Sequence, residues 1–464
     1  LGGSNMNELS CFKAYDIRGE IDVNIDEKIA YRIGRAVAQH FKAKSVVIGF
    51  DARETSPDFA IAASKGVVDA GADVLNIGLA GTEEMYWAVT EFNACAGIEI
   101  TASHNPINYN GMKIVKSKSQ PLDKVEDFDV IKFLAEAENW LSAQKVGKVF
   151  DRKIIARKFY VQRVLSFIDP SILKPLKIVV NPGNGAAGPT FGEIAQGLTN
   201  QGAPLEFICI NEDPDHTFPN GIPNPLIPQN QAATADVVKK VGADFGVAFD
   251  GDFDRCFFFD QSGSFVPGEY MVGLLAAIFL EKEEGAKIVH DPRVIWNTQD
   301  TVRQKGGISV QSKTGHSFIK KTMRDSDAVY GGEISAHHYF RDFAYCDSGM
   351  IPWVLVVELL SKSDHSLGEF VKDRFDKYPS SGELNFLVKD ADSSIANVLK
   401  IFKNKALSFD EIDGISLAFK DWRFNLRKSN TEPLVRLNLE SCGHANSLSD
   451  RAAKIAYYLD GKRV

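Results

Sequence analysis

The chain has 464 residues, which is too long for one ordinary hydrophobic core, so we expect two to four domains. Hydrophobic residues make up 44% and charged residues 25% of it, proportions typical of a globular protein in water. The formal net charge of −8 argues against a general nucleic-acid binder, because phosphate backbones require a basic surface.

The sequence shows no sign of a membrane or an oxidising compartment. No apolar run approaches the roughly 20 residues needed to cross a bilayer, and no basic-then-apolar leader opens the chain. The six cysteines lie far apart and form no CxxC pair, so neither a zinc site nor a disulfide framework is expected. We therefore expect a cytoplasmic protein with neither a nucleic acid nor a membrane as a partner.

The first predicted element is an amphipathic helix over residues 24–41, with Asn24 as its N-cap. Its apolar residues recur every four positions and are Ile25, Ile29, Ile33, Val37 and Phe41. Beyond it, short apolar runs alternate with amphipathic segments, as in βαβ units.

Three successive blocks of the chain share a weak internal pattern. Each opens with a β-rich run that ends in Asp or Asn, at 46–51, 178–181 and 288–291. Each continues with a strand introduced by glycine, at 71–75, 202–207 and 306–310. A third strand then runs into a polar loop, at 101–106, 250–255 and 332–338. This shared pattern predicts three similar α/β domains whose polar loops occupy equivalent places.

The last part of the chain has a different pattern. Residues 415–419, 424–426 and 434–439 are predicted strands and 449–459 a closing helix, which fits antiparallel α+β packing. The predicted domains are 1–155, 156–260, 261–375 and 376–464. The fold class is thus α/β, with three similar domains of mixed sheets and a C-terminal α+β domain around a central cleft.

The loop at 101–106 directly follows the apolar run 96–100 and reads Thr-Ala-Ser-His-Asn-Pro. Polar side chains at the carboxyl end of a strand are where α/β proteins place their chemistry. Ser103 is therefore a candidate nucleophile. The segment has no G-x-S-x-G elbow, and the neighbouring His104 is weak evidence for a hydrolytic triad.

Asp250, Asp252 and Asp254 alternate after the apolar run 245–249. In an extended backbone they would point to one side and repel one another unless a cation lay among them. Hard oxygen ligands without His or Cys favour Mg²⁺. A solvated acidic turn is the alternative, but it fits poorly because the apolar run 256–259 follows at once.

Two further loops carry candidate ligand groups. The basic loop at 427–433 offers guanidinium, hydroxyl and amide donors, which suit a phosphate, although a charged hairpin end is the alternative. The loop at 332–337 places a carboxylate, a hydroxyl and an imidazole at alternate positions, which suits a polyol.

The run 183–188 points to a different class of enzyme. It follows a strand and matches the dinucleotide fingerprint G-x-G-x-x-G, with Glu212 and Asp213 where a ribose-binding acid belongs. An NAD-dependent oxidoreductase is therefore an alternative. A glycine-rich turn also packs a helix on a strand, and the oxidoreductase hypothesis gives the serine, carboxylate and basic loops no role.

Residues 12–19 read Phe-Lys-Ala-Tyr-Asp-Ile-Arg-Gly. This segment and the four polar loops, at 101–106, 250–255, 332–338 and 427–433, occur in the order seen in the α-D-phosphohexomutases. The chain resembles that superfamily over nearly its whole length and is most similar to the bacterial phosphomannomutases. The resemblance implies a phosphorylated Ser103 that exchanges its phosphoryl group with a hexose phosphate through a bisphosphorylated intermediate. It also implies Mg²⁺, activation by a hexose 1,6-bisphosphate, a phosphosugar as the partner molecule, and a monomer or homodimer.

The resemblance also assigns roles to individual residues. The catalytic residues would be Ser103, His104, Lys113, Arg18, Arg255 and His337, with Lys113 and His337 as candidates for proton transfer. The metal ligands would be Ser103, Asp250, Asp252 and Asp254. The sugar-binding residues would be Glu333, Ser335, His316, Arg293 and Tyr15. The phosphate-binding residues would be Arg427, Ser429, Asn430, Thr431 and Arg436.

The expected reaction is the interconversion of mannose 6-phosphate and mannose 1-phosphate, serving GDP-mannose and polysaccharide biosynthesis. Phosphoglucomutase, dual-specificity and phosphoglucosamine mutase activities are the alternatives within the superfamily, and a sugar-phosphate-binding regulator is the alternative outside enzymes. In the commonest sugar-loop pattern of the superfamily a glycine precedes the final histidine. In this chain Ala336 precedes His337, and a second histidine, His338, follows.

Overall fold

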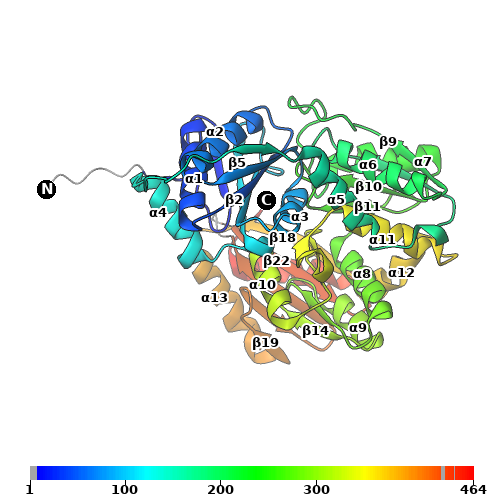
Figure 1. The fold of residues 1–464 in the computed structure, drawn as a ribbon. Coiled ribbons are helices and arrows are strands. Elements are labelled where there is room, and N and C mark those ends of the chain that lie inside the picture. The colour runs from blue at the N-terminus through cyan, green and yellow to red at the C-terminus, as the bar shows by residue number, and fades with distance from the viewer. Residues whose placement is uncertain (1–7, 430–433, 444) are drawn as a thin grey trace. The chain divides into compact units, whose positions relative to one another are not determined.

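The computed structural model describes residues 8–429, 434–443 and 445–464, which form two compact units (Figure 1). Unit 1 runs through Phe265 and also takes in Asp342–Asp364, and unit 2 comprises Val266–Arg341 and His365–Val464. In the ranges described, no helix is both long and apolar enough to span a bilayer.

The first sheet of unit 1 is mixed. Its order is β1-β5-β4-β2-β3-β7, with β6 beside β5. The strands are β1 (Ile17–Glu20), β5 (Tyr109–Lys116), β4 (Ala96–Ile100), β2 (Ser45–Phe50), β3 (Asp73–Leu79), β7 (Val149–Asp151) and β6 (Gln120–Pro121). The pairs β2–β3, β2–β4 and β3–β7 are parallel, whereas β5 pairs antiparallel with β1 and β4. Parallel β2 and β4 bring Asp51 and Thr101, which follow them, to one edge of the sheet, where the Asp51 amide donates to the Ile100 carbonyl at 2.9 Å.

The helices that accompany this sheet are α1 (Glu27–His40), α2 (Ser56–Asp69), α3 (Thr82–Glu91) and α4 (Asp129–Ala137). Helices α1 and α2 lie side by side (Figure 1). Glycine permits their close approach, since a Cβ at Gly34 would lie 2.2 Å from the Ala63 carbonyl oxygen and one at Gly66 2.1 Å from that of Tyr31. Any larger residue at either position would force the helices apart.

The predicted N-cap of α1 is wrong by two residues. Asp26 caps the helix, because its carboxylate accepts from the Ile29 amide at 2.7 Å. Asn24 instead accepts from the Glu20 amide at 3.2 Å in the turn before the helix. The four-residue apolar spacing therefore starts ahead of the helix itself.

The second sheet of unit 1 has the order β11-β10-β8-β9. These strands are β11 (Cys256–Phe259), β10 (Phe245–Phe249), β8 (Leu176–Asn181) and β9 (Leu205–Cys209), and β12 (Phe265–Val266) follows in the chain. The helices are α5 (Lys153–Leu165), α6 (Ala187–Asn200) and α7 (Ala232–Val241). The pairs of β8 with β9 and β10 are parallel, and that of β10 with β11 is antiparallel, so this sheet is also mixed.

Unit 1 is completed by a segment from later in the chain. It carries β17 (Cys346–Asp347) and α11 (Met350–Ser361). Helix α11 is apolar on nearly every side and almost wholly buried. Its Trp353 ring packs against Phe191 and Phe207 at centroid distances of 5.3 and 5.9 Å.

Unit 2 begins with a third mixed sheet, in which β13 is parallel to β14 and β15, and β16 is antiparallel to β15. The strands are β14 (Ile308–Gln311), β13 (Lys287–His290), β15 (Tyr330–Gly332) and β16 (His338–Phe340). The helices are α8 (Gly268–Lys282), α9 (Trp296–Gln304), α10 (His316–Ser326) and α12 (Leu367–Lys377).

The last sheet is antiparallel throughout the pairs that the structure describes, in the order β19-β20-β21-β22-β18-β23. The strands are β19 (Ser408–Asp410), β20 (Ile415–Ala418), β21 (Trp422–Lys428), β22 (Leu434–Ser441), β18 (Ser380–Leu387) and β23 (Lys462–Arg463). Helices α13 (Ala391–Phe402) and α14 (Asn446–Leu459) complete it. The predicted fold class, mixed α/β sheets followed by an α+β domain, is confirmed.

Candidate active site

Ser103 lies in a tight loop that follows β4 in unit 1. Its φ is 48°, in the left-handed region that non-glycine residues rarely adopt. The Ser103 amide donates to the Thr101 hydroxyl at 2.8 Å, and the Asn105 amide donates to the Ala102 carbonyl at 2.9 Å. The loop is therefore closed on itself, and Ser103 is only 4% exposed.

The Ser103 hydroxyl points at the aspartate loop. Its Oγ donates to Asp250 Oδ2 at 2.9 Å, and His104 Nδ1 lies 3.2 Å from the same Oγ. A Cβ on Gly251 would lie 2.6 Å from the Ser103 carbonyl oxygen, so the two loops are in direct contact. The structure thus places Ser103 beside the first aspartate of the predicted metal loop.

The three aspartates converge through a turn. The extended backbone expected from the sequence is wrong, because residues 250–255 join the antiparallel strands β10 and β11, and Phe253 has a φ of 45°. An extended chain would spread the first and last aspartate over about 13 Å. In the turn, Asp250, Asp252 and Asp254 offer carboxylate oxygens that all lie within 4.8 Å of one another.

Lys113, on β5, bonds two of these carboxylates. Its Nζ donates to Asp252 Oδ2 at 2.8 Å and to Asp254 Oδ2 at 2.5 Å, and the Thr82 hydroxyl donates to the same Asp252 oxygen at 2.5 Å. Burial opposes the charge on Lys113, but the two carboxylates outweigh it and raise the pKa of the lysine. Burial also opposes the charge on Asp252, and Lys113 reverses that effect and lowers its pKa.

One oxygen of the aspartate loop lacks such compensation. Asp252 Oδ1 is buried and has no hydrogen-bond partner among the residues described. A buried acceptor without a donor is unfavourable by roughly 1–3 kcal/mol. A cation ligand would satisfy this oxygen, and a set of carboxylate oxygens without nitrogen or sulfur fits Mg²⁺.

Arg255 links His104 to Asp250. Its Nε donates to Asp250 Oδ2 at 2.9 Å, and its Nη2 donates to His104 Nδ1 at 2.6 Å. His104 as a whole is exposed, but desolvation of its ring by the surrounding protein, followed by the charges of Arg255 and Arg18, lowers its pKa well below the usual value. The imidazole is therefore neutral near pH 7, and because Nδ1 accepts, Nε2 carries the proton.

Arg18 and Tyr15 lie at the start of the described chain. Arg18, on β1, donates through Nη1 to the Thr101 carbonyl at 3.0 Å and lies 3.6 Å from Asp16. Tyr15 lies in the bend before β1 and is 37% exposed. Arg18 is thus held against the Ser103 loop.

Glu99 is a residue of this region that the sequence analysis missed. It lies on β4 and is fully buried, and neither of its side-chain oxygens has a hydrogen-bond partner within the described part of the chain. Burial, with added repulsion from Asp51 and Asp252, raises the pKa of Glu99 well above its usual value. The available signal was an acidic residue inside the apolar run 96–100.

In unit 2, Glu333 and Ser335 converge with Arg293. The Glu333 carboxylate accepts from the Gly315 amide at 2.8 Å and from the Tyr339 hydroxyl at 2.6 Å. Arg293 Nη2 donates to Ser335 Oγ at 3.3 Å and lies 3.8 Å from Glu333 Oε1. The contact with Gly315 also brings the start of α10, where His316 lies, to this loop.

Asp291 orients Arg293 and was not identified from the sequence. Arg293 Nη2 donates to Asp291 Oδ2 at 2.6 Å, and the Ile334 amide donates to the same oxygen at 3.1 Å. Burial disfavours the Asp291 charge, but Arg293 outweighs it and lowers the pKa of the aspartate. Its position at the end of the β-rich run 288–291 was the feature of the sequence that could have identified Asp291 as a site residue.

Ala336 stands where the sugar loop usually has a glycine, and it adopts the backbone conformation that glycine favours. Its φ is 71°, and its amide donates to the Glu333 carbonyl at 3.0 Å. An alanine in this left-handed conformation costs roughly 1–2 kcal/mol. The backbone turn that glycine favours is therefore retained without glycine.

The two neighbouring imidazoles have different surroundings. His337 stacks against Tyr339, with ring centroids 6.1 Å apart. His338 is fully buried, its Nδ1 lies 2.7 Å from the Tyr330 hydroxyl, and burial followed by the charge of His337 lowers its pKa to about 3. His338 is therefore a neutral core residue.

Three arginines surround Glu383, a residue that the sequence analysis missed. Arg427 Nη2 donates to Glu383 Oε2 at 2.8 Å, Arg293 Nη1 lies 3.8 Å from that oxygen, and Arg436 Nη1 lies 3.5 Å from Oε1. Arg427 and Arg436 stand opposite each other on β21 and β22. Burial, followed by the charge of Arg293, lowers the pKa of Arg427. Three guanidinium groups around one carboxylate leave a positive surplus that suits an anion.

The phosphate loop is described only at its two ends. The Ser429 amide donates to the Leu434 carbonyl at 2.8 Å. Asn430 and Thr431 lie outside the described residues.

The glycine-rich run 183–188 is used for close packing. The Ala186 amide donates to the Gly251 carbonyl at 3.1 Å, and a Cβ at Gly185 would lie 2.8 Å from that oxygen. A Cβ at Gly188 would lie 1.8 Å from the Glu212 carbonyl oxygen. The glycines of this run thus permit close contact with the backbone of Gly251 and Glu212, and the run supports the aspartate loop.

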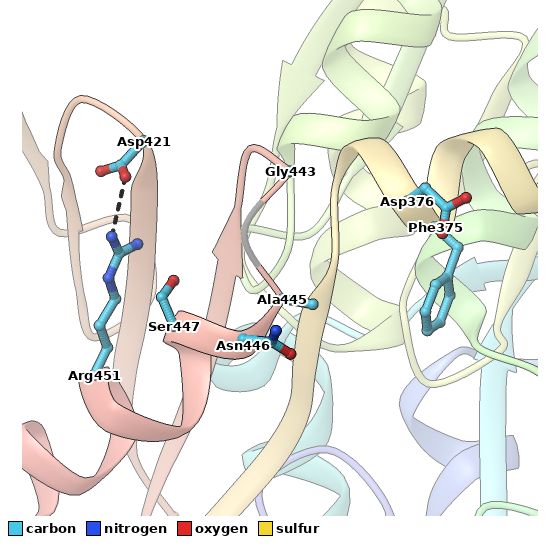
Figure 2. Close-up of a pocket in the computed structure, with 8 residues that line it drawn as sticks. All are labelled: Phe375, Asp376, Asp421, Gly443, Ala445, Asn446, Ser447 and Arg451. Carbon is cyan, nitrogen blue, oxygen red and sulfur yellow. Dashed lines mark hydrogen bonds and ion pairs between the residues drawn. The ribbon is translucent and has the colours of Figure 1, made fainter.

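Unit 2 also has a pocket of about 550 Å³, and none of the predicted site residues lines it. It is lined by Phe375, Asp376, Asp421, Gly443, Ala445, Asn446, Ser447 and Arg451. Figure 2 shows Arg451 and Asp421 facing each other across a 3.1 Å ion pair. The pair neutralises the charge at that end of the pocket.

Family models match four consecutive parts of the chain. All four describe phosphoglucomutase/phosphomannomutase: the alpha/beta/alpha domains I, II and III match residues 10–139, 158–263 and 267–378, and the C-terminal domain matches 383–456. Together they cover most of the chain.

Similar proteins lead to the same family. A phosphomannomutase from Salmonella montevideo is 52% identical, and one from Escherichia coli strain K12 is 51% identical, each over 98% of this chain and 100% of its own length. The crystal structure of a phosphoglucomutase/phosphomannomutase family protein from Burkholderia thailandensis is 28% identical, covers 98% of this chain and 99% of its own, and superposes with a TM-score of 0.86. The chain therefore belongs to the phosphoglucomutase/phosphomannomutase family.

Proposed function

We propose that this chain is a phosphomannomutase, which interconverts mannose 6-phosphate and mannose 1-phosphate through a phosphorylated Ser103. The observation that carries the proposal is the 2.9 Å contact of Ser103 Oγ with Asp250 Oδ2, inside a cluster of three carboxylates. The names of relatives about half identical over nearly the full chain support mannose as the sugar.

In the forward reaction the sugar hydroxyl at O1 or O6 attacks the phosphorus of phosphorylated Ser103. A new bond forms between that oxygen and phosphorus while the bond from phosphorus to Ser103 Oγ breaks. The hydroxyl loses a proton and Ser103 Oγ gains one, so charge and atoms balance. The mannose 1,6-bisphosphate formed turns end over end, and its other phosphoryl group returns to Ser103. Lys113 and His337 are the proposed proton-transfer residues.

Asp250, Asp252 and Asp254, with an oxygen of phosphorylated Ser103, would hold Mg²⁺. The ion, when bound, offsets negative charge on the oxygens of the transferring phosphoryl group. Arg255, which contacts Asp250 and His104, adds a fixed positive charge beside Ser103. A hexose 1,6-bisphosphate would activate the enzyme by restoring the phosphoryl group of Ser103 after the intermediate has escaped.

The remaining roles are proposed for residues of other loops. Glu333 and Ser335 bind sugar hydroxyls, with His316 and Tyr15 as further sugar-binding residues. Arg293 lies between Ser335 and Glu383, so it suits either the sugar or the phosphate that is not transferred. The phosphate itself is bound by Arg427, Ser429, Asn430, Thr431 and Arg436.

Phosphoglucomutase or dual-specificity activity is the second candidate. The matching family models name both sugars, and relatives from Xanthomonas campestris, 48% identical, are called phosphohexose mutases. The sugars are epimers at C2, so they differ by the orientation of one hydroxyl. Discrimination is strong only where the site hydrogen-bonds that hydroxyl. A comparison of kcat/KM for mannose 1-phosphate and glucose 1-phosphate decides between the two.

Intact mass spectrometry tests the phosphoserine mechanism. The purified protein should carry an added mass of roughly 80 Da, that of one phosphoryl group, on a fraction of molecules, and the group should map to Ser103. Ser103→Ala should lose both the added mass and mutase turnover. Full turnover in Ser103→Ala would refute the mechanism.

A further inference from the structure

We propose that Arg53 is a positioning residue for the loop that carries the phosphoryl group, acting through three backbone carbonyls of that loop and that of Tyr109, the first residue of β5. The inference rests on the proposed role of Ser103. It assigns a function to a side chain that none of the predicted site loops contains.

Arg53 follows β2, and its guanidinium reaches across to the Ser103 loop. Nη1 donates to the carbonyls of Pro106 and Tyr109, both at 2.9 Å. Nη2 donates to the carbonyls of Ser103 at 3.0 Å and Asn105 at 2.6 Å. The side chain of Arg53 is almost fully buried, so its donors are shielded from water. One guanidinium thus holds three points of the loop and the start of β5.

Arg53 is itself held in place by its neighbours. Its amide donates to Asp51 Oδ1 at 3.0 Å, and its Nε lies 3.5 Å from Asp51 Oδ2. The Ser56 hydroxyl donates to Asp51 Oδ1 at 2.6 Å and accepts from Asn110 Nδ2 at 3.0 Å. The Phe218 ring covers the guanidinium at 6.0 Å. The arginine is therefore a fixed support and not a flexible surface cation.

The loop needs this support because its conformation is costly. Ser103 has a φ of 48°, and a left-handed non-glycine residue costs about 1–3 kcal/mol. The Ser103 carbonyl, whose bond to Arg53 is buried, would cost roughly 1–3 kcal/mol more if it were left without a donor. Arginine suits the task because its planar fork presents five donors in two directions, whereas the lysine ammonium is a point donor.

Positioning affects the chemical step more than substrate binding. Ser103 Oγ has to present its phosphoryl group at one place and take it back there in every cycle. A shift of about 1 Å in a reacting group costs roughly 10²-fold in rate. Within the Ser103 loop, the bonds of Arg53 go to backbone oxygens and not to side chains, so its loss should lower kcat and leave KM nearly unchanged.

The test compares Arg53→Lys, Arg53→Gln and Arg53→Met with a matched control, Arg32→Lys. Arg32 lies in the same unit and also donates to two backbone carbonyls, those of Ala135 at 2.7 Å and Glu136 at 3.2 Å. All variants should lower the thermal midpoint. Only the Arg53 variants should lower kcat, by about 10²-fold, with KM within about threefold of wild type.

Phosphorus NMR of the phosphorylated protein supplies a readout that stability alone does not move. The phosphoserine resonance should shift or broaden in the Arg53 variants and keep its wild-type position in Arg32→Lys. Arg53→Gln, which retains an amide donor, serves if Arg53→Met does not fold. A wild-type kcat in Arg53→Lys, or equal losses of kcat in Arg53→Lys and Arg32→Lys, would overturn the inference. Full turnover in Ser103→Ala would instead overturn the proposed function on which it rests.

Discussion

Arg423 and Glu440 stand directly opposite each other on β21 and β22, and both are almost fully buried. Arg423 Nη1 donates to Glu440 Oε1 at 3.0 Å and to the Arg293 carbonyl at 3.1 Å. Glu440 accepts from the amides of Ile295 and Trp296 at 2.9 and 2.8 Å. One buried ion pair of the last sheet therefore fixes the segment that carries Arg293.

Glu440→Gln should be strongly destabilising, because it leaves the Arg423 charge buried without a counter-ion. We expect a loss of about 3–5 kcal/mol in the free energy of unfolding, measured by urea denaturation. The control is Lys428→Met, which breaks an exposed pair with Asp392 and should cost at most about 1 kcal/mol. An unchanged urea midpoint for Glu440→Gln would show that the pair contributes nothing.

Removal of divalent cations should stop turnover without unfolding the protein. Lys113 already bonds Asp252 and Asp254, and Arg255 bonds Asp250, so these two cations offset much of the carboxylate charge without a metal ion, although Asp252 Oδ1 stays without a donor among the described residues. With EDTA we expect mutase activity to disappear, the thermal midpoint to move by only a few degrees, and activity to return with added Mg²⁺. Full activity in EDTA would count against the aspartate assignment.

Arg427→Lys should weaken binding of the phosphate that is not transferred. Charged hydrogen bonds contribute roughly 1.5–3 kcal/mol each, so KM should rise about 10- to 100-fold. The neighbour Lys428 pairs with Asp392 and makes no contact with Glu383 that the structure records, so Lys428→Met is the control and should keep its KM. Equal KM values for all three proteins would remove Arg427 from the phosphate site.

His338 should make folding sensitive to mild acid. Its pKa is about 3 in the folded protein, because burial disfavours the charged form, against about 6.5 when unfolded. Below pH 6.5 the unfolded chain binds the extra proton, so this stability is complete above pH 6.5 and falls as the pH drops toward 3.

The corresponding variant is His338→Gln, compared with wild type at pH 7 and pH 5 by urea denaturation. The wild type should lose about 2 kcal/mol more than the variant between these values, since each pH unit is worth about 1.4 kcal/mol. The same pH dependence in both proteins would mean that His338 does not carry the effect.

The sequence predicted those strands and loops whose local residue pattern is characteristic by itself. Runs such as 245–249 are apolar and β-rich throughout, and a polar loop at the end of a buried strand has few structural uses. Local sequence did not distinguish between two possible N-caps of α1 that lie two residues apart, so Asn24 was predicted in place of Asp26. It also could not show that residues 250–255 turn, because the turn depends on the pairing of β10 with β11.

The residues that were missed act through distant partners. Arg53 bonds carbonyls 50 to 56 positions away, and Glu383 meets Arg427 44 positions away. Such residues carry no motif of their own, because any arginine or glutamate would look the same in the sequence. Glu99 and Asp291 were recognisable in principle, because Glu99 is an acidic residue within an apolar run and Asp291 is an acidic residue at the end of one.

The return of residues 342–364 to unit 1 has a consequence for how the chain folds as it is synthesised. Helix α11 packs its Trp353 against Phe191 and Phe207, so unit 1 lacks part of its core until the ribosome has passed residue 364. A fragment ending at Phe265 would expose the surface that α11 covers. A fragment starting at Val266 would carry α11 with its apolar sides in water. Separate expression of either unit would therefore need Asp342–Asp364 to be supplied to unit 1 and removed from unit 2.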